Sequence, residues 1–211
     1  MLNKEQTVQA IEIMGEMFPE AECELDHRNV FELLCATIMS AQATDVSVNK
    51  VTPKLFEMYP TSKDLANASI DTVMSLINSI GLYRNKSKYL INMARMLEQD
   101  FNGEVPRTRT ELMKLPGVGR KTANVVLSVG YDIPAIAVDT HVERVTKRLK
   151  IVPEYASVRE VENILMEKLP EDLWSIAHHS LIFYGRYRCT ARKPDCESCR
   201  YILNEVGYGS K

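Results

Sequence analysis

Apolar residues recur at three- and four-residue intervals along most of the chain, which is the spacing of one face of an α-helix. Five segments either follow this spacing or are apolar almost throughout: 8–18, 31–39, 48–56, 70–80 and 88–101. Pro19 follows the first segment as a stop signal, and Asp45 is placed to cap the third. We therefore predict helices over these segments, with 31–39 as a buried one.

The remaining chain carries further helix signals and few strand signals. Thr108-x-x-Glu111 and Ser157-x-x-Glu160 are capping boxes, in which a hydroxyl and a carboxylate mark the start of a helix. Segment 125–130, VVLSVG, contains β-branched residues but directly follows a helix-start signal. We find no internal repeat and no long linker. The sequence therefore predicts an all-α fold in which short loops join many helices.

Composition and cysteine usage narrow the class of protein. The 211 residues, 45% hydrophobic and 26% charged, can form one domain or two small ones with a proper core. No apolar run reaches the length of a membrane span, and the N-terminus does not have the features of a secretory signal. Five cysteines, an odd number, argue for a reducing compartment and against a disulfide framework. We expect a cytoplasmic protein with no membrane partner.

The positions of the charged residues are more informative about a binding partner than the net charge. The net charge of −2 does not point to a nucleic-acid partner, but basic residues gather in four clusters: 84–88, 120–121, 144–150 and 186–193. An acidic protein can present a local basic surface to a polyanion. Taken alone, each cluster is more often a solvated helix face.

The most informative stretch is LPGVGRKTA, residues 115–123, which lies between two helical segments. Pro116 ends the first helix, Gly117 and Gly119 permit a tight hairpin, and the second helix begins near Arg120. Unpaired N–H groups and the positive dipole end at such a helix start bind phosphate. The alternative is an ordinary helical hairpin whose glycines serve packing. The full pattern favours a helix–hairpin–helix that binds the DNA backbone.

Lys121 occupies an unusual position for a lysine. It lies in the first turn of the second helix, where the dipole and neighbouring Arg120 both disfavour an ammonium ion. A neutral amine there could act as a nucleophile. The physics of the sequence leaves open the alternative that Lys121 is one more phosphate contact.

A carboxylate follows the apolar run of segment 135–138. Asp139 starts a helix and could simply be its N-cap, the commonest role of an aspartate before a helix. Its functional alternative is a base, or an electrostatic partner for a cationic transition state. His141 follows two residues later. It either orients the aspartate, binds phosphate or is a packed, hydrogen-bonded histidine.

Together these motifs closely resemble the endonuclease III family, the bifunctional DNA glycosylases and abasic-site lyases of base excision repair. Six segments carry the resemblance: FELLCATIMSAQATDVSVNK (31–50), IGLYRNKSK (80–88), LPGVGRKTANVV (115–126), AVDTHVERV (137–145), HHSLIFYGRYRC (178–189) and ARKPDCESC (191–199). The resemblance implies two helical domains with a DNA-binding cleft between them. One would span 23–133 and carry the hairpin, and the other would join 1–22 to 134–211.

The resemblance also implies a chemistry. Lys121 matches the family's Schiff-base lysine and Asp139 its catalytic aspartate. Gln42 and Leu82 would fill the gap left when a damaged base is flipped out of the duplex. The lysine would displace an oxidised pyrimidine, and β-elimination would then break the strand at the abasic site without a cofactor. The expected partner is double-stranded DNA that carries a damaged pyrimidine or an abasic site, bound by a monomer.

Two other functions share part of this pattern. A monofunctional glycosylase would keep the aspartate and lack Lys121. A hairpin module that only binds DNA would need neither Lys121 nor Asp139. Arg192 and Lys193 could contact the DNA backbone if the loop that carries them keeps its shape, and a monovalent cation could sit on the hairpin carbonyls.

The C-terminal cysteines depart from the family pattern at one position. The family ends in Cys-x6-Cys-x2-Cys-x5-Cys around a [4Fe–4S] cluster, and Cys189, Cys196 and Cys199 match its first three positions. Glu205 occupies the fourth. Glu205, Cys23 or an exogenous ligand could complete a cluster, or the thiolates could hold a three-iron cluster or zinc. We favour the remaining alternative, that no cluster binds and packing holds the loop.

Overall fold

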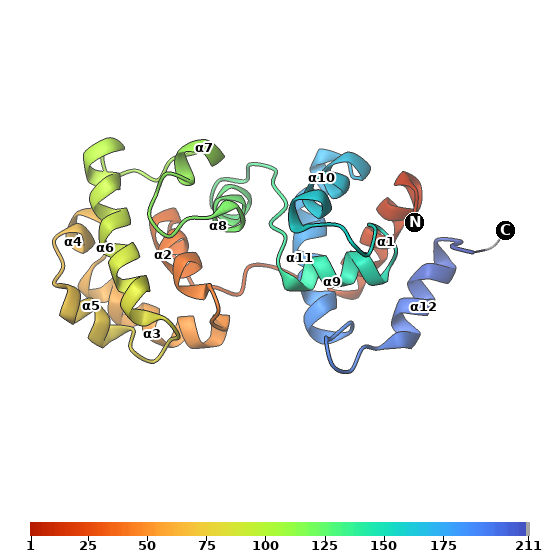
Figure 1. The fold of residues 1–211 in the computed structure, drawn as a ribbon, viewed down its shortest axis with the longest axis horizontal. Helices are drawn as coiled ribbons and strands as arrows, with labels where there is room; N and C mark the ends of the chain where they lie inside the picture. Colours follow the sequence, from red (N-terminus) through yellow and green to blue (C-terminus); the bar gives the residue numbers. More distant parts are fainter. Residues whose placement is uncertain (210–211) are drawn as a thin grey trace. The chain divides into compact units, whose positions relative to one another are not determined.

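The computed structural model describes residues 1–209, whose regular elements are helices joined by loops (Figure 1). Its α-helices are α1 (Lys4–Met17), α2 (Val30–Ser40), α3 (Asp45–Met58), α4 (Ser62–Ala66), α5 (Ile70–Leu76), α6 (Tyr83–Asp100), α7 (Arg109–Leu112), α8 (Arg120–Val125), α9 (Thr140–Arg148), α10 (Val158–Lys168), α11 (Trp174–Tyr187) and α12 (Cys196–Glu205). A π-helical turn, η1 (Val126–Gly130), continues α8, and a 3-10 turn, η2 (Glu171–Leu173), precedes α11. Extended pairing in the described residues is limited to one bridge between Cys189 and Pro194. The predicted all-α class is confirmed.

The chain divides into two compact units. The continuous unit is Cys23–Ile133, and the discontinuous unit joins Met1–Glu22 to the chain from Pro134 onward. No helix in the described residues is long and apolar enough to cross a membrane.

Helix α6 organises the continuous unit, where it packs most extensively against α4 and also against α5 and α2 (Figure 1). Leu90, Ala94 and Leu97 recur on its buried face at helical spacing. Helix α2 is apolar on nearly all sides, with Leu33, Leu34 and most of its other residues buried, as the sequence predicts. The hairpin of residues 115–119 packs against these two helices, because Gly117 lies against Ile38 of α2 and Tyr89 of α6.

The discontinuous unit is built around α11, which packs against α9 and α1. The N-terminal segment is tied to the C-terminal part of the chain by several polar contacts. The Leu2 amide donates to the Lys150 carbonyl at 2.7 Å, and Lys168 Nζ donates to the Leu2 carbonyl at 2.6 Å. Gln6 Nε2 donates to the Val206 carbonyl at 2.9 Å. Helix α1 is therefore part of a fold that the chain completes only from Pro134 onward.

Two local predictions need correction. Thr44, not Asp45, caps α3, because its hydroxyl accepts the Ser47 amide at 3.2 Å while Asp45 is the first helical residue. Helix α6 begins at Tyr83 rather than at 88, since Leu82 adopts a left-handed backbone that starts the helix earlier. Segment 125–130 is helical, in agreement with the helix-start signal that precedes it, and its residues Val126–Gly130 form a π-helical turn.

Candidate nucleic-acid interface and catalytic residues

The hairpin of residues 115–119 is shaped by its two glycines in different ways. Gly117 has φ +80°, and a Cβ there would lie 2.9 Å from Tyr89 Cβ and 3.2 Å from Ile38 Cγ2. Only glycine fits, because both the backbone and the space exclude a side chain. Gly119 has ordinary extended backbone, φ −92°, and a Cβ there would meet nothing within 4 Å. The first glycine therefore lets the hairpin pack, whereas the second leaves open space in front of α8.

Helix α8 begins at Arg120, directly behind that open space. Its N-cap, Gly119, has no side chain to cap the first amides, and its first turn contains no acidic residue. Lys121 lies in this turn and is exposed. Nothing in the turn offsets its charge, so a phosphate or an electrophile can approach both the amides and the amine.

Two neighbouring loops of the continuous unit carry Gln42 and Leu82. Both residues have positive φ, 54° and 59°, which is uncommon outside glycine, and Leu82 is 54% exposed. The Gln42 carbonyl lies 3.6 Å from the position of a Cβ on Gly81, so the loops are in contact. Gln42 follows α2 and Leu82 precedes α6, the same two helices that contact Gly117. The structure therefore brings these two residues together beside the hairpin.

Asp139, in the discontinuous unit, is the N-cap of α9. Its Oδ1 accepts the amide of His141 at 2.8 Å and that of Val142 at 2.9 Å. Within the part of the chain that the structure describes, Oδ2 accepts no hydrogen bond. Asp139 is therefore the N-cap of α9, which is one of its two predicted roles. Its second carboxylate oxygen, Oδ2, is not used by the cap.

His141 is held by an arginine one turn later on α9. Arg144 Nη2 lies 3.0 Å from His141 Nδ1, and an arginine can only donate, so Nδ1 is the acceptor. The neutral ring then carries its proton on Nε2, as a donor. Gly185 makes this close packing possible, since a Cβ there would lie 2.8 Å from His141 Cβ. His141 is thus packed and hydrogen-bonded, with one N–H remaining.

Two arginines, which sequence reasoning grouped only as a basic cluster, shape the cysteine loop. Arg144 Nε donates to the Cys189 carbonyl at 3.0 Å, and Arg148 Nη1 donates to Cys189 Sγ at 3.4 Å and to the Thr190 carbonyl at 2.8 Å. In the sequence, only their four-residue spacing, which places both on one face of a helix, indicated that they could bind the same partner. Both arginines therefore bind carbonyls and sulfur of this loop.

The tip of the loop is exposed and folds on itself. Thr190 Oγ1 donates to the Lys193 carbonyl at 2.7 Å and accepts the Lys193 amide at 3.1 Å. Arg192 and Lys193 are both exposed. Their side chains are available to a polyanion.

Two of the three loop thiols, Cys189 and Cys199, are engaged with protein groups, whereas Cys196 is exposed. Cys189 is fully buried, and the hydrogen bond that it receives from Cys199 lowers the pKa of Cys189, aided by Arg148. Donating that bond raises the pKa of Cys199, whose Sγ also accepts the Tyr184 hydroxyl at 3.4 Å. In the described residues no group of three or more His, Cys, Asp or Glu side chains is placed to hold a metal.

Glu205, which the family resemblance aligns with the fourth cluster ligand, lies at the far end of α12 from Cys196. Cys196 begins α12 and Glu205 ends it, so helix geometry separates them by roughly 14 Å. Glu205 is also exposed. Cys23, the other thiol weighed from the sequence, belongs to the continuous unit. The residues present, in this arrangement, do not match the four-thiolate set of a [4Fe–4S] cluster.

Comparison with known proteins gives the class of the chain. Residues 35–171 match the HhH-GPD superfamily base excision DNA repair proteins. Endonuclease III of Bacillus subtilis (strain 168) is 54% identical over 199 residues, which cover 94% of this chain and 91% of that protein. A non-covalent endonuclease III–DNA complex matches with TM-score 0.92 and 54% identity, over 97% of this chain and 95% of the other. A trapped endonuclease III–DNA covalent intermediate matches with TM-score 0.91 and 56% identity, over 94% and 93%.

The chain belongs to the endonuclease III family. It is therefore a DNA glycosylase and abasic-site lyase of base excision repair. The predicted helix–hairpin–helix glycosylase fold and enzyme class are confirmed.

Proposed function

We propose that this enzyme removes oxidised pyrimidines from double-stranded DNA and cleaves the resulting abasic site, with Lys121 as the nucleophile. The observation that carries the proposal is an exposed lysine in the uncapped first turn of α8, behind the open space at Gly119. Similarity to a trapped endonuclease III–DNA covalent intermediate supports covalent chemistry.

In the proposed reaction the neutral Lys121 amine attacks C1′ of the damaged nucleotide. The C1′–N bond breaks, and the base leaves with a proton. The remaining N–H proton passes to O4′ as the C1′–O4′ bond breaks, which opens the ring and leaves a C1′=N imine. Loss of a 2′ proton to water then expels the 3′ phosphate, which is β-elimination. Every atom of these steps comes from Lys121, the nucleotide and water.

The carboxylate of Asp139 would stabilise positive charge that develops on the sugar and assist proton removal from the lysine. Its free Oδ2 supports this role, because Oδ1 is already engaged by two amides. The remaining N–H of His141 would donate to a phosphate. Asp139 therefore combines a structural task with a chemical one.

Gln42 and Leu82 would occupy the duplex where the damaged nucleotide is extruded. Their adjacent loops, their positive φ values and the exposure of Leu82 support this role. Positive φ on non-glycine residues marks backbone strain, which often accompanies function. Gly117, Gly119 and Arg120 would bind the backbone beside them, and Arg192 and Lys193 would add phosphate contacts from the cysteine loop.

Borohydride reduction tests the role of Lys121, because it traps an imine between protein and DNA. Wild-type protein is expected to trap on duplex that contains thymine glycol, and Lys121→Ala is expected to lose trapping. Lys121→Arg is the matched control, since it keeps the charge but not a nucleophilic amine. It should retain DNA affinity and still fail to trap.

Two outcomes would contradict the proposal. Trapping that persists in Lys121→Arg would assign the nucleophile to another amine. Wild-type protein that excises the base but never traps would indicate a monofunctional glycosylase.

For the cysteine loop, we propose that it is held by hydrogen bonds rather than by a cluster. The bonds from Arg144 and Arg148, the Cys189–Pro194 bridge and the α12 cap at Asp195 support this. Protein purified without oxygen should contain neither iron nor sulfide and should be colourless. Stoichiometric iron and sulfide in that preparation would overturn the proposal.

A further inference from the structure

The first half of α6 joins two of the proposed DNA contacts. Leu82 is the N-cap of the helix and is 54% exposed, and Tyr89, about two turns later, packs against the hairpin. A Cβ on Gly117 would lie 2.9 Å from Tyr89 Cβ and 3.0 Å from Tyr89 Cγ. Leu82 and Tyr89 are separated by roughly 10 Å along the helix. A duplex that Leu82 enters and that the hairpin binds therefore passes over the surface of α6 between them.

Asn85 and Tyr89 present hydrogen-bond donors on that surface. Residues three and four positions apart lie on one face of a helix, so Leu82, Asn85 and Tyr89 form a single row. Asn85 is exposed, and Tyr89 is 45% exposed. Within residues 1–209 neither of these two side chains forms a hydrogen bond or an ion pair. Because Cβ atoms four residues apart are about 5–6 Å from each other, the Asn85 amide and the Tyr89 hydroxyl can donate to one ligand.

The charge of this half of α6 indicates the kind of ligand. The helix contains no acidic residue before Glu98. Arg84 and Lys88 are both exposed, and Lys88 is three residues from Asn85 and adjacent to Tyr89. The positive charge on this surface is therefore not offset by a carboxylate of the same helix. Two neutral donors beside a lysine are suited to a phosphate group.

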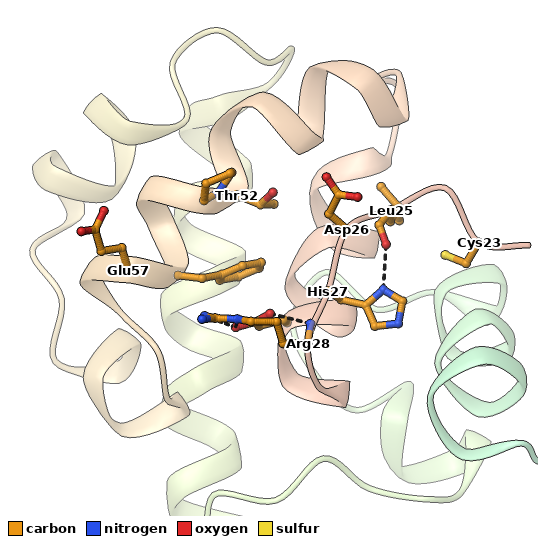
Figure 2. A pocket seen from close by; sticks show the side chains of 10 residues that line it. Cys23, Leu25, Asp26, His27, Arg28, Thr52 and Glu57 are labelled. Atoms are coloured by element: carbon orange, nitrogen blue, oxygen red, sulfur yellow. Dashed lines mark hydrogen bonds and ion pairs between the residues drawn. The ribbon is translucent and has the colours of Figure 1, made fainter.

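The other end of α2 has the opposite character. Asp26 and Glu57 are exposed at its N-terminal end, on opposite sides of a pocket (Figure 2). Arg28 lies in the same place, but its Nε donates to the buried carboxylate of Glu32 at 2.8 Å. The 11 residues of α2 span roughly 16 Å, and Ile38, near its C-terminal end, contacts the hairpin. Within the continuous unit, charge therefore favours a polyanion on the side of α6 and the hairpin.

We propose that Asn85 and Tyr89 bind one phosphate group of the DNA backbone, between the point where Leu82 enters the duplex and the hairpin. Asn85 Nδ2 and Tyr89 Oη donate to the non-bridging oxygens of that phosphate, and Lys88 adds its positive charge. This inference rests on the proposed DNA contacts of Leu82 and the hairpin and extends them. A backbone contact at this place fixes the position of the duplex without reading its sequence.

Affinity for a duplex that contains tetrahydrofuran, an abasic-site analogue that forms no imine, tests the contact. Tyr89→Phe removes only the hydroxyl and keeps the ring against Gly117. It should leave the melting temperature unchanged and weaken binding about tenfold, close to the value of one hydrogen bond to a charged group. Tyr155→Phe is the matched control, because Tyr155 is 88% exposed in the discontinuous unit, and it should bind as the wild type does.

Substitutions of Asn85 test the second donor. Asn85→Ala should weaken binding by a factor similar to that of Tyr89→Phe. Asn85→Asp should weaken it further, because a carboxylate at this position repels the phosphate. Wild-type affinity in both Tyr89→Phe and Asn85→Ala would overturn the proposal.

Neutral methylphosphonate groups, placed one at a time in the duplex, show whether the two side chains share a phosphate. At one position the wild type should lose affinity, and there neither Tyr89→Phe nor Asn85→Ala should lose more. Losses that add at every position would overturn the shared contact. These measurements do not depend on Lys121, since they require no catalysis. A wild type that binds this duplex but never traps with borohydride would contradict the proposed function alone.

Discussion

At the scale of single residues, Asp139 shows how one side chain can hold a structural and a chemical task. Its Oδ1 caps α9 through two amides, and its Oδ2 is left for the reaction. Asparagine is as good an N-cap as aspartate, whereas alanine costs about 1 kcal/mol at such a position. The two tasks can therefore be separated by substitution.

We expect Asp139→Asn to fold with nearly wild-type stability and to lose most base excision, because the cap remains and the charge does not. Asp139→Ala should lose excision and also about 1 kcal/mol of the free energy of unfolding. Urea denaturation and single-turnover excision measure the two effects. An Asn variant that excises at the wild-type rate would limit Asp139 to its role as a cap.

At the scale of elements, the two glycines of the hairpin lead to opposite expectations. Gly117→Ala places a Cβ 2.9 Å from Tyr89 in a backbone with φ +80°, so it should destabilise the protein by more than about 1 kcal/mol. Gly119→Ala, the matched control, adds a methyl group in open space at ordinary backbone angles. It should change stability by less than about 0.5 kcal/mol.

The same pair tests the DNA contact when affinity is measured beside stability. Gly119→Ala should weaken DNA binding, because the methyl group stands where a phosphate approaches α8. The loss should appear at low salt with a non-specific duplex, since the contact is to the backbone. If a stable Gly119→Ala protein binds DNA as tightly as the wild type, the phosphate does not bind at the start of α8.

Helix positions were largely predictable because apolar spacing is a local property of the chain. Segment 31–39 and the start of α8 at Arg120 followed from pattern and glycine chemistry alone. The left-handed residues Gln42 and Leu82 had no such signal, because positive φ on a non-glycine residue is imposed by surrounding packing. For that reason α6 was predicted to start five residues too late.

The roles of the candidate site residues were harder to predict from the sequence than the positions of the helices. The position of Lys121 in the sequence is compatible with either a nucleophile or a phosphate contact. Only the family resemblance favours the nucleophile. The bonds from Arg144 and Arg148 to the cysteine loop join residues more than 40 positions apart. Such contacts depend on the packing of α9 and α11, which periodicity does not specify.

At the scale of the whole molecule, the two units differ in how the chain forms them. The continuous unit uses one uninterrupted segment, whereas the discontinuous unit needs α1 to complete its core. Ile11 and Met14 of α1 are fully buried there, in one cluster with Leu181 and Tyr184 of α11. A fragment that starts at residue 134 would expose the surface that α1 covers.

We therefore expect a fragment of residues 23–133 to fold alone, with helical circular dichroism and a cooperative thermal transition. A fragment of residues 134–211 should remain largely unfolded, and adding a peptide of residues 1–22 should restore helix to it. The folded 23–133 fragment should bind duplex DNA weakly through its hairpin but should not excise a base, because it lacks Asp139. A cooperative transition in 134–211 without the peptide would show that α1 is dispensable for that core.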